Sequence, residues 1–284
     1  MKITLSKFAG FCGGVKRAYE MVMKLNMADV KQPVYVLGSL VHNEDVVKKI
    51  EEKGICKIDY NDFLEGNYKE IGTIIITAHG SGPEIYQLAK ERDIDLVDAT
   101  CPKVTNVQKL SNDFSEKNYE VIIIGDKDHK EVKGIFEWGG SLGKIISKGD
   151  ELENSILDKE KRVVVISQTT QDEDFFEKIS QRISVKYENV KIINTICLAT
   201  KNRQEELKQI AEENEVVLVI GSPTSANSTR LYEIASSLNP RSYFIERTED
   251  IQRDWLSEVN TIGISAGAST PSWVIEEVLK FLQE

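Results

Sequence analysis

The sequence lacks the long apolar runs that mark membrane and secreted proteins. Its longest ones, such as Val121–Ile124 and Val216–Ile220, are far too short to span a bilayer. No apolar stretch of signal-peptide length precedes Gly10. We therefore expect a cytoplasmic protein that has no membrane partner.

The sequence also has fewer basic than acidic residues. The 36 basic residues are outnumbered by 46 acidic ones, which gives a net charge of −10, and lysines and arginines are interleaved with acids. This balance disfavours nucleic-acid binding, which depends on the neutralisation of phosphates. A local anion site is still compatible with it, because backbone amides and neutral side chains can bind an anion without net positive charge.

Cysteine and histidine are rare, with four and three residues respectively in a chain of 284. No two cysteines form a C-x-x-C pair, so zinc-ribbon and thioredoxin-like sites are excluded. A disulfide framework is disfavoured in a reducing cytoplasm. We interpret Cys56 as a small buried hydrophobic residue, which is the usual role of a free cysteine. Cys12, Cys101 and Cys197 need another explanation.

Short β-branched runs alternate with amphipathic helical stretches along the whole chain. We expect strands at Lys2–Leu5, Val34–Leu37, Thr73–Thr77, Ile94–Asp98, Glu120–Gly125, Lys144–Ser147, Arg162–Ser167, Val190–Asn194, Val216–Gly221, Ser242–Glu246 and Thr261–Ser265. We expect helices at Gly14–Met27, Glu44–Lys53, Pro83–Arg92, Pro102–Lys117, Asp172–Ile183, Ala199–Asn214, Ser228–Ser237 and Ser272–Gln283. This alternation predicts an α/β protein whose sheets are parallel and covered by helices.

The three remaining cysteines divide the chain into similar parts. They are separated by 89 and 96 residues, and each interval holds about three strand–helix units of roughly 30 residues. Each cysteine stands where a strand ends and a helix begins. We therefore predict three similar α/β lobes around an approximate three-fold axis, in a trefoil centred on the cysteines. The predicted lobes are residues 13–98, 99–193 and 194–284, the last completed by residues 1–12.

Their setting suits an iron–sulfur centre. A helix N-terminus stabilises a thiolate, which is the form that iron binds. Zinc would want a fourth protein ligand in a structural site, or three protein ligands and water in a catalytic one. Three cysteines instead suit a [4Fe–4S] cluster, one per chain, in which the missing fourth thiolate leaves one iron open to substrate. The spacing alone leaves the alternative, three structural cysteines, open.

Polar residues gather just after the expected strands, where parallel sheets place ligand sites. All three histidines are among them, although a lone loop histidine is usually a surface or capping residue. Ser225, Asn227 and Ser269 are typical helix caps, but capping and anion binding use the same helix ends. Glu131 is either a first-turn helix acid or, near an anion and a cluster, a proton donor. The set comprises His42, His79, His129, Glu131, Thr169, Ser225, Asn227 and Ser269.

These residues occur in motifs that resemble those of the 4-hydroxy-3-methylbut-2-enyl diphosphate reductase (IspH/LytB) family. The motifs run in order from residue 11 to about residue 271. They are Phe11-Cys-Gly-Gly-Val15, Val41-His-Asn43, Ala78-His-Gly80, Asp98-Ala-Thr-Cys-Pro102, His129-Lys-Glu-Val132, Gln168-Thr-Thr170, Thr195-Ile-Cys197, Ser225-Ala-Asn-Ser228 and Ala266-Gly-Ala-Ser269.

The resemblance implies an oxidoreductase that forms isopentenyl and dimethylallyl diphosphate in the last step of the non-mevalonate (MEP) isoprenoid pathway. It implies a [4Fe–4S] cluster on Cys12, Cys101 and Cys197, with ferredoxin or flavodoxin as the electron donor. The substrate's hydroxyl would bind near Thr169 and Glu131, and Glu131 would supply a proton; the catalytic residues implied are Glu131, Thr169 and His129. The residues implied to hold the diphosphate are His42, His79, His129, Ser225, Asn227 and Ser269.

Three positions depart from the family pattern. Ala226 stands where the family usually has a second serine. Lys130 replaces a common proline between His129 and Glu131, a change that could loosen that turn. Ser81-Gly82 follows His79-Gly80, where an apolar residue and then serine are more usual.

Rival readings of two kinds remain, one enzymatic and one non-enzymatic. Another three-cysteine cluster enzyme, such as quinolinate synthase, would need carboxylate-binding residues, whereas the His/Ser/Asn set fits phosphate better. An iron–sulfur sensor would be expected to carry a DNA-binding segment, and a nucleotide-binding module would not need the cysteines.

Overall fold

The computed structural model of the chain describes residues 1–140, 143–148 and 161–284. They form two compact units. The first unit comprises residues 1–16, 42–46 and 197–284, and the second unit comprises residues 17–41 and 47–196. Among the described residues, no helix combines the length and the apolar character needed to cross a membrane.

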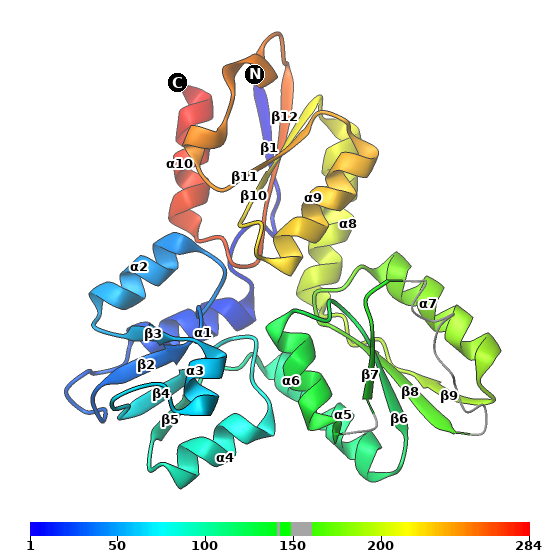
Figure 1. Cartoon of the computed structure of the whole chain (residues 1–284). Helices are drawn as coiled ribbons and strands as arrows, with labels where there is room; N and C mark the ends of the chain where they lie inside the picture. The colour runs from blue at the N-terminus through cyan, green and yellow to red at the C-terminus, as the bar shows by residue number, and fades with distance from the viewer. Residues whose placement is uncertain (141–142, 149–160) are drawn as a thin grey trace. The chain divides into compact units, whose positions relative to one another are not determined.

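The first unit is built on one four-stranded parallel sheet (Figure 1). Its strands, in spatial order, are β1 (Lys2–Leu5), β12 (Thr261–Ala266), β10 (Val216–Ile220) and β11 (Ser242–Ile245). The central strand β10 is apolar at every position because both of its faces are covered. Its even-numbered residues pack with α10 (Ser272–Gln283), and Val217 and Val219 pack with the opposite helices.

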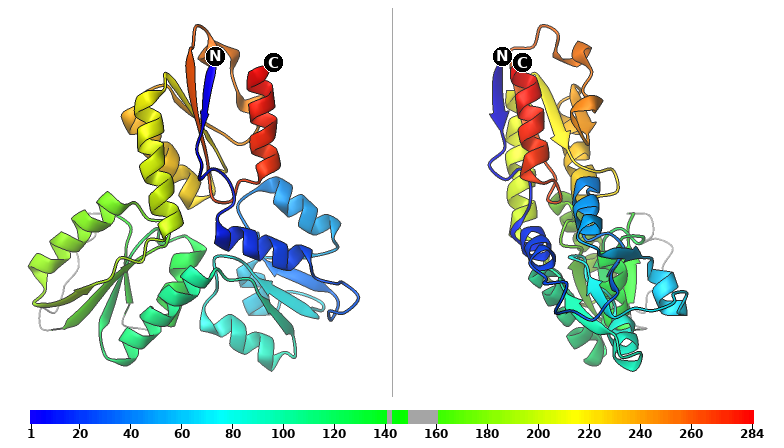
Figure 2. Two further views of the ribbon diagram at one scale, coloured as in Figure 1. Left: turned by 180° about the vertical axis from the view of Figure 1, so that it is seen from behind. Right: turned by 90° about the vertical axis from the view of Figure 1, so that its left-hand side faces the viewer.

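The helices on that opposite face begin at the carboxyl edge of the sheet or close to it. They are α8 (Leu198–Glu213) and α9 (Ala226–Leu238), and Figure 2 shows α8 and α10 on the two sides of the strands. Two short 3₁₀ helices, η2 (Thr248–Asp250) and η3 (Arg253–Leu256), follow β11. The helices α1 (Gly13–Met23) and α2 (Glu44–Glu52) begin in the first unit and continue into the second.

The second unit contains two further four-stranded parallel sheets. The strands of one, in spatial order, are β3 (Cys56–Ile58), β2 (Val34–Leu37), β4 (Thr73–Ile76) and β5 (Asp95–Asp98). Those of the other are β7 (Gly143–Ile146), β6 (Glu120–Ile124), β8 (Arg162–Ser167) and β9 (Asn189–Ile192). The remaining helices are α3 (Tyr60–Glu65), α4 (Pro83–Glu91), α5 (Pro102–Glu116), α6 (Lys130–Trp138) and α7 (Glu173–Lys186).

The three sheets share one strand order. Two of the sheets have the orders β3-β2-β4-β5 and β7-β6-β8-β9, so the first strand along the chain lies between the second and the third, and the fourth lies at the edge. The sheet of the first unit has the equivalent order β11-β10-β12-β1, in which the N-terminal strand β1 takes the place of the fourth strand beside β12. The prediction of three similar α/β lobes with parallel sheets is therefore confirmed. The lobe boundaries and the trefoil arrangement of the lobes stay predictions. The sequence interpretation missed β3, α3 and α6.

Candidate functional site

Two of the three predicted cluster ligands lie in the first unit, each at the start of a helix. Cys197 is the N-cap of α8, and its sulfur lies 3.1 Å from Thr200 Oγ1. Cys12 directly precedes α1, and the amide of Val15 points at its sulfur at 3.5 Å. Both side chains are half-buried. Each sulfur thus faces the positive end of a helix dipole and is still accessible to a ligand.

A buried arginine accompanies this pair. Arg203, on α8, is 3% exposed. Burial lowers the pKa of its guanidinium, and the charges of Cys12, Cys197 and Glu206 act in the opposite direction. Two half-buried thiols at helix N-termini beside a buried cation fit a group that is bound through thiolates and carries negative charge, as an iron–sulfur cluster does.

Cys101 has the same local setting in the second unit. It is the N-cap of α5, with Pro102 at the start of the helix as expected, and its amide donates to Ala78 O at 3.0 Å. Arg17 fixes the preceding residue by donating to Thr100 O at 3.1 Å. Cys101 belongs to the other unit from Cys12 and Cys197, so the convergence of the three stays a prediction.

The interpretation of Cys56 as a buried residue was wrong. It lies on the edge strand β3 with its side chain exposed. An edge strand of three residues has too few neighbours to bury every side chain.

Glu131 and Thr169 form a buried, doubly hydrogen-bonded pair in the second unit. Glu131 is 2% exposed, and its two carboxylate oxygens accept from Thr169 N at 2.6 Å and from Thr169 Oγ1 at 3.0 Å. Burial raises the pKa of Glu131 to about 7; Thr169 works against this shift and Asp126 adds to it. The carboxyl group can therefore hold or release a proton near neutral pH.

The two histidines of the second unit lie beside this pair. His129 is the N-cap of α6, and its Nδ1 accepts from the amide of Glu131 at 3.2 Å. The rings of His79 and His129 meet edge to face, with centroids 5.3 Å apart. The capping bond keeps the first turn of α6 intact with Lys130 at its first position. The effect of having Lys130 in place of the family's proline stays a prediction.

Neutral donors gather at the N-terminus of α9 in the first unit. Ser225 caps the helix, and Ser269 Oγ lies 3.4 Å from Ser225 Oγ. Asn227 is buried, and its side-chain nitrogen has no hydrogen-bond partner among the described residues. His42 Nδ1 lies 3.2 Å from Thr224 Oγ1, a hydroxyl that the sequence interpretation did not single out.

Two glycines hold the start of α9 against the ends of β10 and β12. A Cβ atom at Gly221 or Gly267 would lie 2.3 or 2.0 Å from Ser228 Oγ, so a larger residue would push the helix away. Ser225, Asn227 and Ser269 are in this way held together at the carboxyl edge of the sheet. A helix N-terminus with hydroxyl and amide donors is a site for an anion.

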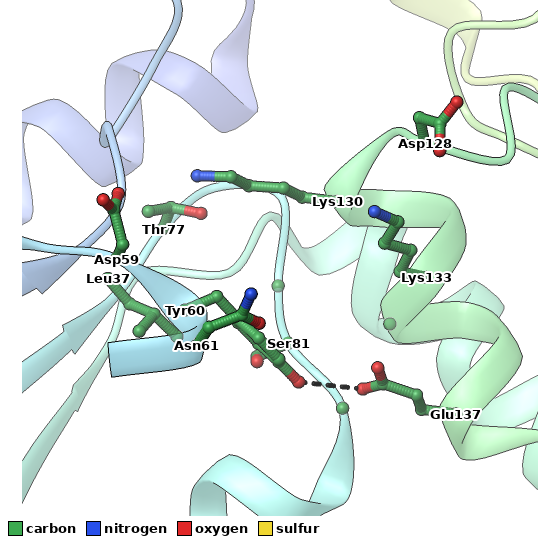
Figure 3. Close-up of a pocket in the computed structure, with 13 residues that line it drawn as sticks. Leu37, Asp59, Tyr60, Asn61, Thr77, Ser81, Asp128, Lys130, Lys133 and Glu137 are labelled. Carbon is green, nitrogen blue, oxygen red and sulfur yellow. Dashed lines mark hydrogen bonds between the residues drawn. The ribbon is translucent and has the colours of Figure 1, made fainter. Parts of the chain in front are cut away.

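A separate cavity of about 590 Å³ lies in the second unit (Figure 3). Lys130, Lys133 and Glu137 reach into it from α6, and Tyr60 donates to Glu137 across it at 3.1 Å. Burial raises the pKa of Glu137, while Tyr60 lowers it. Its lining includes none of the predicted site residues.

One prediction follows from the burial of Glu131. Because its folded-state pKa is raised, the native state favours the protonated carboxyl group; this stabilisation is complete below pH 4.5 and is lost as the pH rises through about 7. Glu131→Gln should therefore stabilise the protein at pH 8, by at most roughly 3 kcal/mol from the size of the pKa change. The gain should shrink towards pH 4.5. Thermal unfolding at the two pH values measures it, and an equal gain at both would contradict the assignment.

Comparisons with known proteins cover nearly the whole chain. A model of the LytB protein family matches residues 3–283. The 4-hydroxy-3-methylbut-2-enyl diphosphate reductase of Aquifex aeolicus (strain VF5) is 36% identical over 285 residues, which cover 99% of this chain and 96% of the relative.

Two solved structures are also similar. One is described as (E)-4-hydroxy-3-methyl-but-2-enyl diphosphate reductase, the terminal enzyme of the non-mevalonate pathway. It is 35% identical, with a TM-score of 0.70 and coverage of 100% of this chain and 99% of that one. The other, the E-1-hydroxy-2-methyl-but-2-enyl-4-diphosphate reductase from Plasmodium falciparum, is 31% identical, with a TM-score of 0.90 and coverage of 99% and 87%.

Proposed function

We propose the function of this chain from one premise: the chain belongs to the LytB protein family. Its relatives match it from end to end and are named as 4-hydroxy-3-methylbut-2-enyl diphosphate reductases. The activity is then the reductive removal of the allylic hydroxyl group. Two electrons and two protons convert the substrate to water and to isopentenyl or dimethylallyl diphosphate, at the end of the non-mevalonate pathway.

The cofactor that we propose is one [4Fe–4S] cluster per chain, held by Cys12, Cys101 and Cys197. When bound, such a cluster supplies the electrons and an iron that is open to the hydroxyl group. The helix N-termini at all three cysteines support this assignment, and Arg203 supports it for Cys12 and Cys197. Ferredoxin or flavodoxin would deliver the electrons, and the reaction would take place in the cytoplasm.

The observation that carries the proposed mechanism is the Glu131–Thr169 pair. Glu131 can hold or release a proton near neutral pH, and Thr169 Oγ1 lies 3.0 Å from one of its carboxyl oxygens. We assign Glu131 as the acid that protonates the leaving hydroxyl, with Thr169 orienting both groups. His129 is bonded to the amide of Glu131, so it fixes the start of the helix that presents the acid.

The diphosphate would bind to His42, His79, His129, Ser225, Asn227 and Ser269. Hydroxyl, amide and imidazole donors suit this task because a diphosphate needs several hydrogen bonds, and a helix N-terminus supplies positive potential. Ala226 contributes no hydroxyl group, so Ser225 and Ser269 carry this part of the site.

Asn227→Ala tests the diphosphate assignment. The buried amide nitrogen of Asn227 has no partner among the described residues, so its removal should cost less than about 1 kcal/mol of stability. KM for the substrate should still rise roughly tenfold, by the loss of one hydrogen bond to a charged group. Ser225→Ala is the comparison, because it also removes the cap of α9 and should lower the melting temperature. An unchanged KM in the Asn227 variant would remove this residue from the site.

The activity itself is tested by anaerobic turnover of the hydroxylated diphosphate with reduced methyl viologen. We expect both five-carbon diphosphates as products. An iron-loaded protein that reduces no substrate would contradict the proposed function.

A further inference from the structure

The segment that leads to Cys12 is tied to α8 by two charged side chains one helical turn apart. Glu206 accepts hydrogen bonds from the Ser6 hydroxyl, from Lys7 N at 3.1 Å and from Phe8 N at 3.4 Å. Arg203 donates from Nε to Phe8 O at 2.9 Å and from Nη2 to Gly10 O at 2.8 Å. Residues 6–10 are therefore hydrogen-bonded to α8 through both of these side chains.

Arg203 also belongs to the helix that begins at the second cysteine. Its Nη1 donates to Ala199 O at 3.2 Å, in the first turn after Cys197. One buried guanidinium therefore bonds to the chain on the approach to Cys12 and to the start of the Cys197 helix. The far side of the Cys12 segment is fixed as well, because Cys12 N donates to Ala268 O at 3.3 Å.

Packing alone does not explain why the buried residue at position 203 is an arginine. Replacing a buried ionic group with an apolar side chain of similar volume is often neutral or stabilising. A guanidinium that is 3% exposed, with the two cysteine sulfurs among the charges acting on it, has a clear use if those sulfurs carry negative charge. Its hydrogen bonds go to neutral carbonyl groups, and the negative charges that act on it are Glu206, one turn further along α8, and the two cysteine sulfurs.

We propose that Arg203 is a positioning residue for the cluster: it fixes the Cys12 segment against the helix of Cys197 and places a permanent positive charge beside both sulfurs. The second part rests on the proposed function, because it assumes that the sulfurs bind an iron–sulfur cluster. Reduction adds negative charge to that group, so a nearby cation favours the reduced form. Loss of the cation should therefore make reduction harder.

Three variants separate charge from positioning. Arg203→Gln removes the charge and part of the hydrogen bonding, and Arg203→Lys keeps the charge but loses the planar fork. The control is Arg241→Gln in the same unit, because Arg241 also donates to a carbonyl, Trp255 O at 3.0 Å, but lies before β11 at the other edge of the sheet.

The first readout is an anaerobic redox titration of the iron-loaded proteins followed by electron paramagnetic resonance. At a fixed solution potential, Arg203→Gln should lower the ratio of reduced to oxidised cluster about tenfold, which is 59 mV for a one-electron couple. Arg203→Lys and Arg241→Gln should stay within about twofold of the wild type on the same scale. A ratio in Arg203→Gln that also stays within this range would overturn the electrostatic part.

The second readout needs no iron. In the apoprotein of both Arg203 variants, the amides of residues 7–12 should exchange about tenfold faster, or more, than in the wild type. The amides of the strands should exchange at the wild-type rate. Arg241→Gln should leave these amides as they are. Unchanged exchange in Arg203→Gln would overturn the positioning part. Failure of the proposed function looks different: the wild type would then bind no iron, while the exchange result would still stand.

Discussion

Glu131→Gln is expected to reduce kcat roughly 10²- to 10⁴-fold, the usual contribution of a general acid. The substitution keeps the size of the side chain and an oxygen that can accept from Thr169 N, but it removes the proton that the leaving hydroxyl needs. Diphosphate binding should persist, because the histidine, serine and asparagine donors are untouched. Steady-state and single-turnover assays with reduced methyl viologen separate the two effects.

The pH dependence gives a sharper form of the same prediction. Burial raises the pKa of Glu131 to about 7, so kcat/KM of the wild type should fall above that pH as the acid loses its proton. Glu131→Gln should lack this alkaline limb.

Glu137→Gln is the matched control for Glu131. This residue lies on the same helix and also has a pKa raised by burial, but it faces the cavity bordered by Tyr60. The control should keep the wild-type rate. Full activity in Glu131→Gln, or an equal loss in Glu137→Gln, would show that Glu131 is not the acid.

Much of the fold could be predicted because the central strands are buried on both faces. The apolar runs in β6 and β10 are the pattern of a parallel sheet covered by helices, and they indicate the layers without any long-range information. The helix α6 was missed because Gly134 interrupts its pattern at a cost of about 1 kcal/mol. That glycine is explained only by tertiary contacts: a Cβ atom there would lie 3.3 Å from Gln108 of α5 and from the backbone of Ser81.

Only part of the site could be predicted, because some of its contacts follow from strand order and others depend on long-range packing. Glu131 and Thr169 follow neighbouring strands of a parallel sheet, so strand order alone brings them to one edge. Arg203 and Glu206 could not be recognised, because they stand among alternating charges that look like a solvated helix face. The burial of Arg203 and the hydrogen bonds of Glu206 depend on the N-terminal segment packing on α8, a contact between residues almost 200 positions apart. Neither spacing nor composition reports such a contact.

Cys197→Ser should lose the cluster and with it all activity above background. Iron should fall from about four atoms per chain, the content of one [4Fe–4S] cluster, to near zero in protein purified without air. Serine can still cap α8 and bond to Thr200, so the first unit should fold, with a lower melting temperature because the stabilisation from cluster binding is gone. Cys56→Ser is the matched control, since that cysteine is exposed on an edge strand and should be replaceable with no loss of iron or rate. Iron analysis, visible absorption and turnover of the two variants decide the matter: an active, iron-loaded Cys197 variant, or a Cys56 variant that loses iron, would contradict the assignment of the ligands.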